Sequence, residues 1–155
     1  MKAVKALLSL SLSVGFCAAV HAQNERASLR GITSVGILVE GLDGDAQKCG
    51  ITEDALDAAV RLPLSNSRIK VNNGNLKLEY LYVNVKVVNA TNDYSRCAAD
   101  ISLAFTKYVQ SERDHGVFWE KSSIVIGPSA YVSRSANEHL EGFTKQFVAA
   151  WLKAN

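Results

Sequence analysis

Apolar residues recur at every second position in several segments of this chain, which is the spacing typical of half-buried β-strands. The clearest segment is 76–88, where Leu81 and Val83 begin an apolar face while Tyr80 and Tyr82 begin the opposite one. Five segments are predicted as strands because they alternate in this way or are rich in β-branched residues: 31–42, 67–71, 76–88, 97–109 and 117–126.

Two other segments repeat apolar residues at steps of three and four positions, as an amphipathic helix does. The first is predicted to begin at Thr52, whose side chain can cap a helix, and to end at Pro63. The second is predicted to begin at the capping-box sequence "SANE" (135–138) and to continue toward the end of the chain. Its apolar face consists of Leu140, Phe143, Phe147 and Trp151.

These elements follow the order β-α-β-β-β-β-α. A helix that connects two strands of one sheet makes them parallel, so the first two strands are expected to be parallel. The Asn-Gly pair in "NNGN" (72–75) predicts a hairpin between the second and third strands, and strands two to five are expected to form an antiparallel meander. Residues 43–50 and 110–116 are predicted as a loop and a turn. With both helices on one face, the predicted fold class is α+β, a two-layer sandwich with a mixed five-stranded sheet.

The first residues carry the pattern of a secretory signal peptide. Lys2 and Lys5 precede an apolar run over 6–20, and small or tolerated residues then predict cleavage after Ala22. The apolar run is shorter than the ~20 residues that span a membrane, so no transmembrane segment is expected after cleavage. The predicted domain organisation is a signal peptide over 1–22, a flexible arm over 23–30 and a single domain over 31–155.

Removal of this leader changes the charge balance of the chain. The full sequence has 17 Lys and Arg against 15 Asp and Glu, but Lys2 and Lys5 belong to the leader, so the remaining chain is neutral. A neutral chain lacks the electrostatic footprint of a protein that binds nucleic acid or an anionic membrane surface. Neither is therefore expected as a partner.

Two cysteines remain after cleavage, Cys49 and Cys97, and export would deliver them to an oxidising compartment. Two thiols in that setting pair by default, so a disulfide is predicted. The functional alternative is a reactive thiolate at Cys49, close to a predicted helix start. Zinc would need about four ligands, and His115 and His139 have no ligand-like spacing to the cysteines. No metal or other cofactor is expected.

A sandwich with both helices on one face leaves the other face of the sheet open. The positions predicted on that face are polar or aromatic: Tyr80, Tyr82, Asn84, Lys86, Asp100, Ser102, Thr106 and Tyr108. Such a surface can bind a protein or a glycan. The candidate binding residues are Tyr80, Tyr82, Asn84, Lys86 and Tyr108. The alternative is that they are ordinary residues on the solvated side of antiparallel strands.

Candidate catalytic chemistry is sparse. Asp114 and His115 lie together in the predicted turn, but the sequence carries no Gly-x-Ser-x-Gly nucleophile motif. The acidic loop at 43–48 begins like a calcium loop, yet Lys48 occupies the position that needs glycine. A non-catalytic module is therefore expected, with a small hydrolase-like enzyme using Asp114/His115 or a carboxylate as the alternative. A homodimer joined through the open face or an edge strand is a third hypothesis.

Three stretches also carry a resemblance to known proteins. "LVEGLDGDAQKCGIT", "LSNSRIKV" and "YLYVNVKVV" resemble small, uncharacterised exported proteins of proteobacteria, in which an acidic loop leads into Cys-Gly and a second cysteine follows a Tyr-x-Tyr-Val-x-Val strand. The resemblance implies pairing of Cys49 with Cys97 and a periplasmic location, and it implies no activity. The strand–helix–strand opening is similar in element order to the amino-terminal domain of the Tol–Pal periplasmic propeller protein. The resulting hypothesis is a periplasmic, non-catalytic binding or envelope-associated module.

Overall fold

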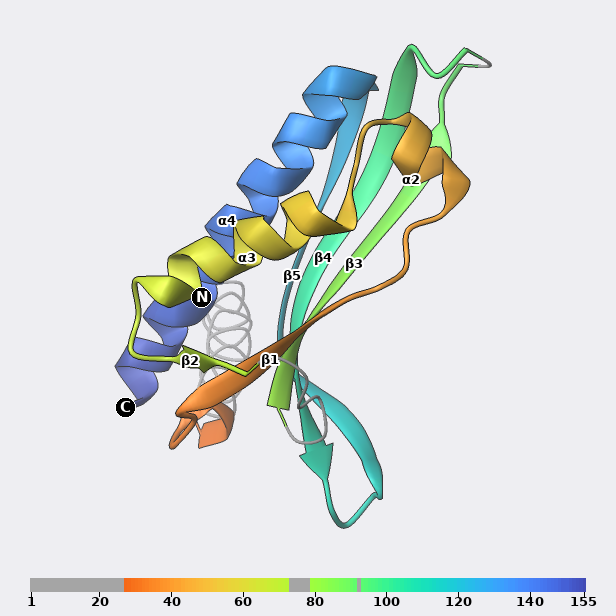
Figure 1. Cartoon of the computed structure of the whole chain (residues 1–155). Helices are drawn as coiled ribbons and strands as arrows, with labels where there is room; N and C mark the ends of the chain where they lie inside the picture. The colour runs from red at the N-terminus through yellow and green to blue at the C-terminus, as the bar shows by residue number, and fades with distance from the viewer. Residues whose placement is uncertain (1–26, 73–78, 92) are drawn as a thin grey trace, which may run out of the picture.

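The computed structural model describes residues 27–72, 79–91 and 93–155 (Figure 1). The elements are β1 (Ser34–Val39), α2 (Gly44–Lys48), α3 (Glu53–Ser65), β2 (Lys70–Val71), β3 (Glu79–Asn89), β4 (Arg96–Val109), β5 (Asp114–Pro128) and α4 (Ser129–Ala154). Helices α3 and α4 contact each other and lie on the same face of one five-stranded sheet. The predicted α+β architecture of two layers with a mixed sheet is thus confirmed.

The strand order in the sheet is β2-β1-β3-β4-β5. Strand β1 is parallel to both β2 and β3, while β3, β4 and β5 are successively antiparallel. The parallel pairing of the first two strands is confirmed, but the predicted hairpin between β2 and β3 is wrong, because β1 lies between them. The Asn-Gly cue itself falls within 73–78, outside the described residues. The long apolar strand β3 occupies a central position, whereas β2 has only two residues and pairs at the edge.

The core lies between the two helices and the face of the sheet that they cover. Alternate residues of β3 and β4, such as Leu81 and Ile101, are fully buried there and meet apolar side chains of α3 and α4, such as Leu56 and Phe147. Burial of each such side chain contributes about 1.5–3 kcal/mol of hydrophobic free energy. The predicted apolar stripes therefore face the sheet, and none of the described helices lies on the opposite face of the sheet.

The ends of the elements differ from the prediction. Residues 43–50, predicted as a loop, contain the short helix α2, whose cap Asp43 accepts a hydrogen bond from the backbone N–H of Ala46 at 2.7 Å. Helix α3 continues two residues beyond Pro63, whose side chain is buried, although proline has no N–H to donate to the carbonyl oxygen of Ala59. Helix α4 begins at Ser129, before the capping-box sequence, because it follows β5 without a loop.

The described end of the predicted flexible arm is attached to the domain. Leu29 is fully buried, and its carbonyl oxygen accepts a hydrogen bond from the side-chain amide of Asn155 at 3.0 Å. The same Asn155 side chain accepts a hydrogen bond from the backbone N–H of Gly31 at 2.7 Å. Hydrogen bonds therefore hold the first described residues against the last residue of the chain. The predicted signal peptide lies outside the described residues. Among the described helices, none has the length and apolar character that a membrane span requires.

Candidate functional site

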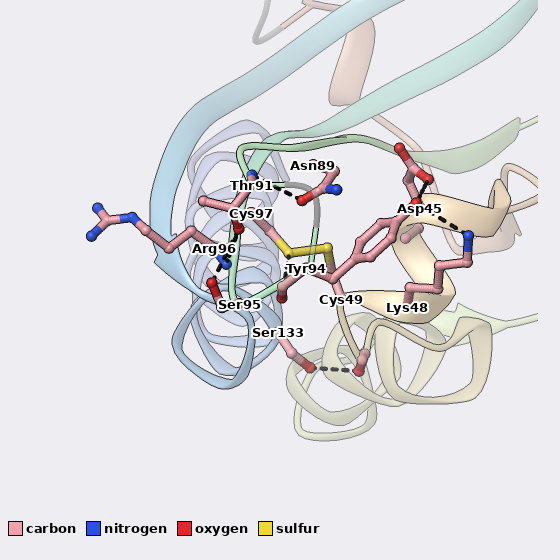
Figure 2. Close-up of a disulfide and its surroundings, with 12 residues drawn as sticks. Asp45, Lys48, Cys49, Asn89, Thr91, Tyr94, Ser95, Arg96, Cys97 and Ser133 are labelled. Atoms are coloured by element: carbon pink, nitrogen blue, oxygen red, sulfur yellow. Dashed lines mark hydrogen bonds between the residues drawn. A yellow bond between two sulfur atoms is a disulfide. The ribbon is translucent and has the colours of Figure 1, made fainter.

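Cys49 and Cys97 form the predicted disulfide (Figure 2). Cys49 caps the end of α2 just before α3, and Cys97 is the second residue of β4, so the bond links the start of the helical layer to the sheet. Both residues are fully buried. A buried, bonded sulfur cannot act as a nucleophile, so the structure overturns the reactive-thiolate alternative for Cys49 in the oxidised protein.

A polar network surrounds this disulfide (Figure 2). The Tyr94 hydroxyl donates a hydrogen bond to Asp45 Oδ1 at 2.7 Å and accepts one from Lys48 Nζ at 3.1 Å. The hydrogen bond that Lys48 donates to the Tyr94 hydroxyl raises the pKa of Lys48. On the other side of the disulfide, Ser133 of α4 donates a hydrogen bond to the carbonyl oxygen of Gly50 at 2.7 Å. The contacts connect α2, α4 and the β3–β4 loop around the covalent link, which indicates a structural role for this region.

The open face, defined as the sheet face opposite α3 and α4, carries the predicted binding residues. Cross-strand register places four open-face residues of β3 opposite four of β4: Tyr80 opposite Thr106, Tyr82 opposite Ala104, Asn84 opposite Ser102 and Lys86 opposite Asp100. Tyr80, Tyr82, Asn84 and Tyr108 are partly exposed, and Lys86 is exposed. Thr106 is only 6% exposed, so it contributes little surface.

His115 joins two of these tyrosines. Its ring centroid lies 5.3 Å from that of Tyr80 and 5.3 Å from that of Tyr108, which it faces in the β4–β5 register. We call Tyr80, Tyr108 and His115 the His–Tyr cluster. Sequence reasoning placed His115 in a turn, but β5 begins at Asp114. The β4–β5 ladder has a register shift between Phe105 and Thr106, which interrupts the alternation of side chains along β5. For this reason the sequence pattern of β5 does not indicate on which face of the sheet His115 lies.

The acid next to His115 does not orient the imidazole ring. Asp114 Oδ1 accepts a hydrogen bond from the backbone N–H of His115 at 2.7 Å, while the ring of His115 packs against tyrosines. The two side chains therefore do not form the hydrogen-bonded acid–histidine pair that the hydrolase alternative requires. Within the described part of the chain, no group of three or more His, Cys, Asp or Glu residues could hold a metal ion.

A second set of contacts holds the middle of the open face. Glu40, just after β1, accepts a hydrogen bond from the Asn84 amide. A hydrogen bond with Glu40, aided by partial burial, raises the pKa of Tyr82. Since the backbone N–H of Glu40 also donates to the carbonyl oxygen of Val83 at 2.9 Å, the carboxylate is fixed beside β3. Two candidate binding residues thus share one acceptor, which the sequence could not indicate because Glu40 is more than 40 residues away from both.

Two shallow pockets lie elsewhere on the surface. One, of about 560 Å³, is beside the disulfide and is lined by Lys48, Cys49, Gly50, Ser129, Ala130, Ser133, Arg134 and Asn137. The other, of about 430 Å³, brings Glu53 and Asp54 beside Thr52 at the start of α3. The acids of the second pocket fall in the first turn of α3, where they interact favourably with the helix dipole. Neither pocket contains a histidine, so neither provides a histidine base for the hydrolase alternative.

Comparisons with known proteins found structural similarity alone. No protein-family model and no curated protein matches the chain. Among solved structures, the PelC dodecamer from Paraburkholderia phytofirmans is 13% identical, with 77% of this chain and 89% of that chain covered and a TM-score of 0.47. A minor lipoprotein from Acinetobacter baumannii is 8% identical, with 76% and 89% covered and a TM-score of 0.37. Rare lipoprotein B from Shewanella oneidensis is 11% identical, with 78% and 92% covered and a TM-score of 0.31. At these values the similarities assign no function to this chain.

Proposed function

We propose that this protein is an exported, non-catalytic binding module of the bacterial envelope, and that it holds a protein or glycan partner on its open face. The observation that carries the proposal is the His–Tyr cluster, in which three rings from three strands pack together on the sheet face opposite α3 and α4. Aromatic side chains provide large contact area with few rotatable bonds, so little entropy is lost when a partner orders them.

The polar residues beside the cluster suit the rim of such a contact surface. Asn84 and Tyr82 are already held by Glu40, and Lys86 and Asp100 present charges of opposite sign from adjacent strands. Prealigned polar groups around an aromatic centre provide hydrogen bonds without a large ordering cost.

Export is supported by the covalent link between Cys49 and Cys97, because disulfides persist mainly in oxidising compartments. The absence of a catalytic role is supported by the environment of His115. The carboxylate of the neighbouring Asp114 accepts a hydrogen bond from the backbone N–H of His115 rather than from the imidazole ring. Both observations fit a surface that contacts a partner without converting it.

The test is capture of the partner in cells. The exported protein would be crosslinked in intact cells and purified, and what it holds would be identified by mass spectrometry for the peptide fraction and by sugar analysis for the glycan fraction. A triple variant, Tyr80→Ser with Tyr82→Ser and Tyr108→Ser, is expected to lose the captured partner and to keep the circular dichroism spectrum of the folded domain.

Tyr131→Ser is the matched control, since Tyr131 is an exposed tyrosine on α4 and does not belong to the open face. It should retain capture. Full capture by a folded triple variant would contradict the proposal, and so would an equal loss of capture by Tyr131→Ser.

A further inference from the structure

Strand β5 forms an edge of the sheet. Within the described ranges its hydrogen-bonded neighbour is β4, and no strand pairs with its outer side. An edge strand presents unpaired backbone N–H and C=O groups, which can accept a further strand. Because β5 has 15 residues, the edge is long, and natural proteins commonly shorten or interrupt such edges.

An apolar patch adjoins this edge on the open face. Val88, Ile124 and Ile126 are 62%, 71% and 61% exposed. Ala98 lies between Val88 and Ile126 in the cross-strand register, so the four residues form one continuous surface, which we call the apolar patch. Exposed apolar surface of this kind, reaching an unpaired strand, marks an interaction surface.

The charges of β5 are confined to its first part. Asp114, Glu120 and Lys121 precede a segment from 122 to 128 that contains no charged residue. If two copies of β5 paired in antiparallel orientation about Ile124, residues 122–126 of this segment would lie against the same residues of the second copy. Glu120 would then face Pro128 of the second copy and Lys121 would face its Gly127, so no like charges would oppose each other.

We infer that the occupant of the apolar patch is a second copy of this chain, whose β5 pairs antiparallel with β5 in a register centred on Ile124. Residues directly opposite in an antiparallel pair share a face of the sheet. Ile124 therefore contacts Ile124 of the second copy. Ile126 lies directly opposite Ser122 of the second copy and diagonally opposite Ile124 of that copy. Four isoleucines cluster at the junction, and the two sheets become one.

The self-complementarity of the edge favours this occupant over a different protein. A two-fold interface uses the same patch on both subunits. A largely apolar, uncharged segment whose outer side pairs with no described strand therefore matches its own copy. The His–Tyr cluster lies in the other half of the open face and stays accessible, so the dimer is independent of partner binding at that cluster.

The first test measures molar mass by light scattering over a concentration series, with the full chain expressed with its own leader and its disulfide oxidised. A dimer is expected that dissociates on dilution, and Ile124→Glu should raise its dissociation constant by at least about tenfold, since two unpaired carboxylates would face each other at the junction. Val117→Glu is the matched control, because Val117 is 59% exposed on the same strand and face but lies outside the paired segment. It should leave the dissociation constant unchanged.

The second test fixes the register. Ile124→Cys is expected to form an intermolecular disulfide under mild oxidation, visible as a dimer on a non-reducing gel, because the two Cα atoms would be about 5 Å apart. Ser122→Cys should not crosslink, since the two copies of residue 122 would be four positions out of register. A monomer at all concentrations, with no crosslink at position 124, would overturn the inference and leave the patch to a different protein. Equal crosslinking of both variants would overturn the register.

Discussion

At the scale of single residues, Asp93 shows how a short polar loop is held beside the disulfide. Its Oδ1 accepts a hydrogen bond from the backbone N–H of Ser95 at 3.0 Å. Hydrogen bonds from Ser95 and Thr91 lower the pKa of Asp93 from 3.8 to about 2. The same loop carries Tyr94, whose backbone is left-handed with a φ of 57° and whose hydroxyl reaches Asp45.

The lowered pKa predicts a dependence of stability on pH. Since the folded state holds the Asp93 carboxylate ionised, its contribution is fully present above about pH 4 and is lost as the pH falls through the folded pKa near 2. Asp93→Asn lacks this titration, so the difference in thermal midpoint between wild type and variant should shrink as the pH falls from 4 to 2. Thermal unfolding at several pH values measures it. A difference that stays constant down to pH 2 would contradict the assignment.

The sequence pattern predicts the position of some candidate site residues but not of others. Tyr80, Tyr82, Asn84 and Lys86 could be placed on one face because β3 alternates without interruption. His115 could not be placed on that face from the sequence, because the turn after β4 is shorter than its polar sequence suggests. In addition, the register shift changes which residues of β5 point to each face of the sheet. Glu40 was missed for a different reason, since it approaches β3 only after β1 and β3 pair.

At the scale of elements, the junction between β5 and α4 depends on Gly127. A Cβ atom at that position would lie 2.7 Å from Cδ1 of Tyr131, in the first turn of α4. The glycine therefore permits the helix to begin immediately after the strand, and this direct connection explains why α4 starts at Ser129.

This contact predicts a coupled pair of substitutions. Gly127→Ala should lower the free energy of unfolding by about 0.5–1.5 kcal/mol, because the exposed ring of Tyr131 must leave its rotamer to make room. In a Tyr131→Ala background the same change should cost much less. Urea unfolding of the two single variants, the double variant and wild type gives the coupling. Equal losses in both backgrounds would show that the ring is not the cause.

At the scale of the whole molecule, the disulfide joins segments that are 48 residues apart in sequence. A crosslink of this span removes conformational freedom from the unfolded chain and should stabilise the fold by about 4 kcal/mol in the chain-entropy model. Replacing both residues, Cys49→Ala with Cys97→Ala, should lower the free energy of unfolding by about that amount, together with a smaller loss of packing. Urea unfolding with and without reductant provides the measurement.

Reductant is the internal control for this prediction. It should destabilise wild type and leave the double alanine variant unchanged. A wild-type protein that unfolds at the same urea concentration in both conditions would contradict the stabilising role of the bond.

The sequence by itself determined the elements whose pattern is local. The sequence predicted the period-two alternation of β3 and β4, the apolar stripes of α3 and α4, and the pairing of Cys49 with Cys97. Each of these depends on neighbours along the chain or on the number of thiols that the predicted cleavage leaves. Tertiary structure decided the remainder. The position of β1 between β2 and β3, the burial of Leu29 against the end of α4, and the packing of His115 between two tyrosines each depend on segments distant in sequence. Contacts between distant segments leave no periodic pattern in either segment alone. They are therefore determined only when the strands and helices pack together.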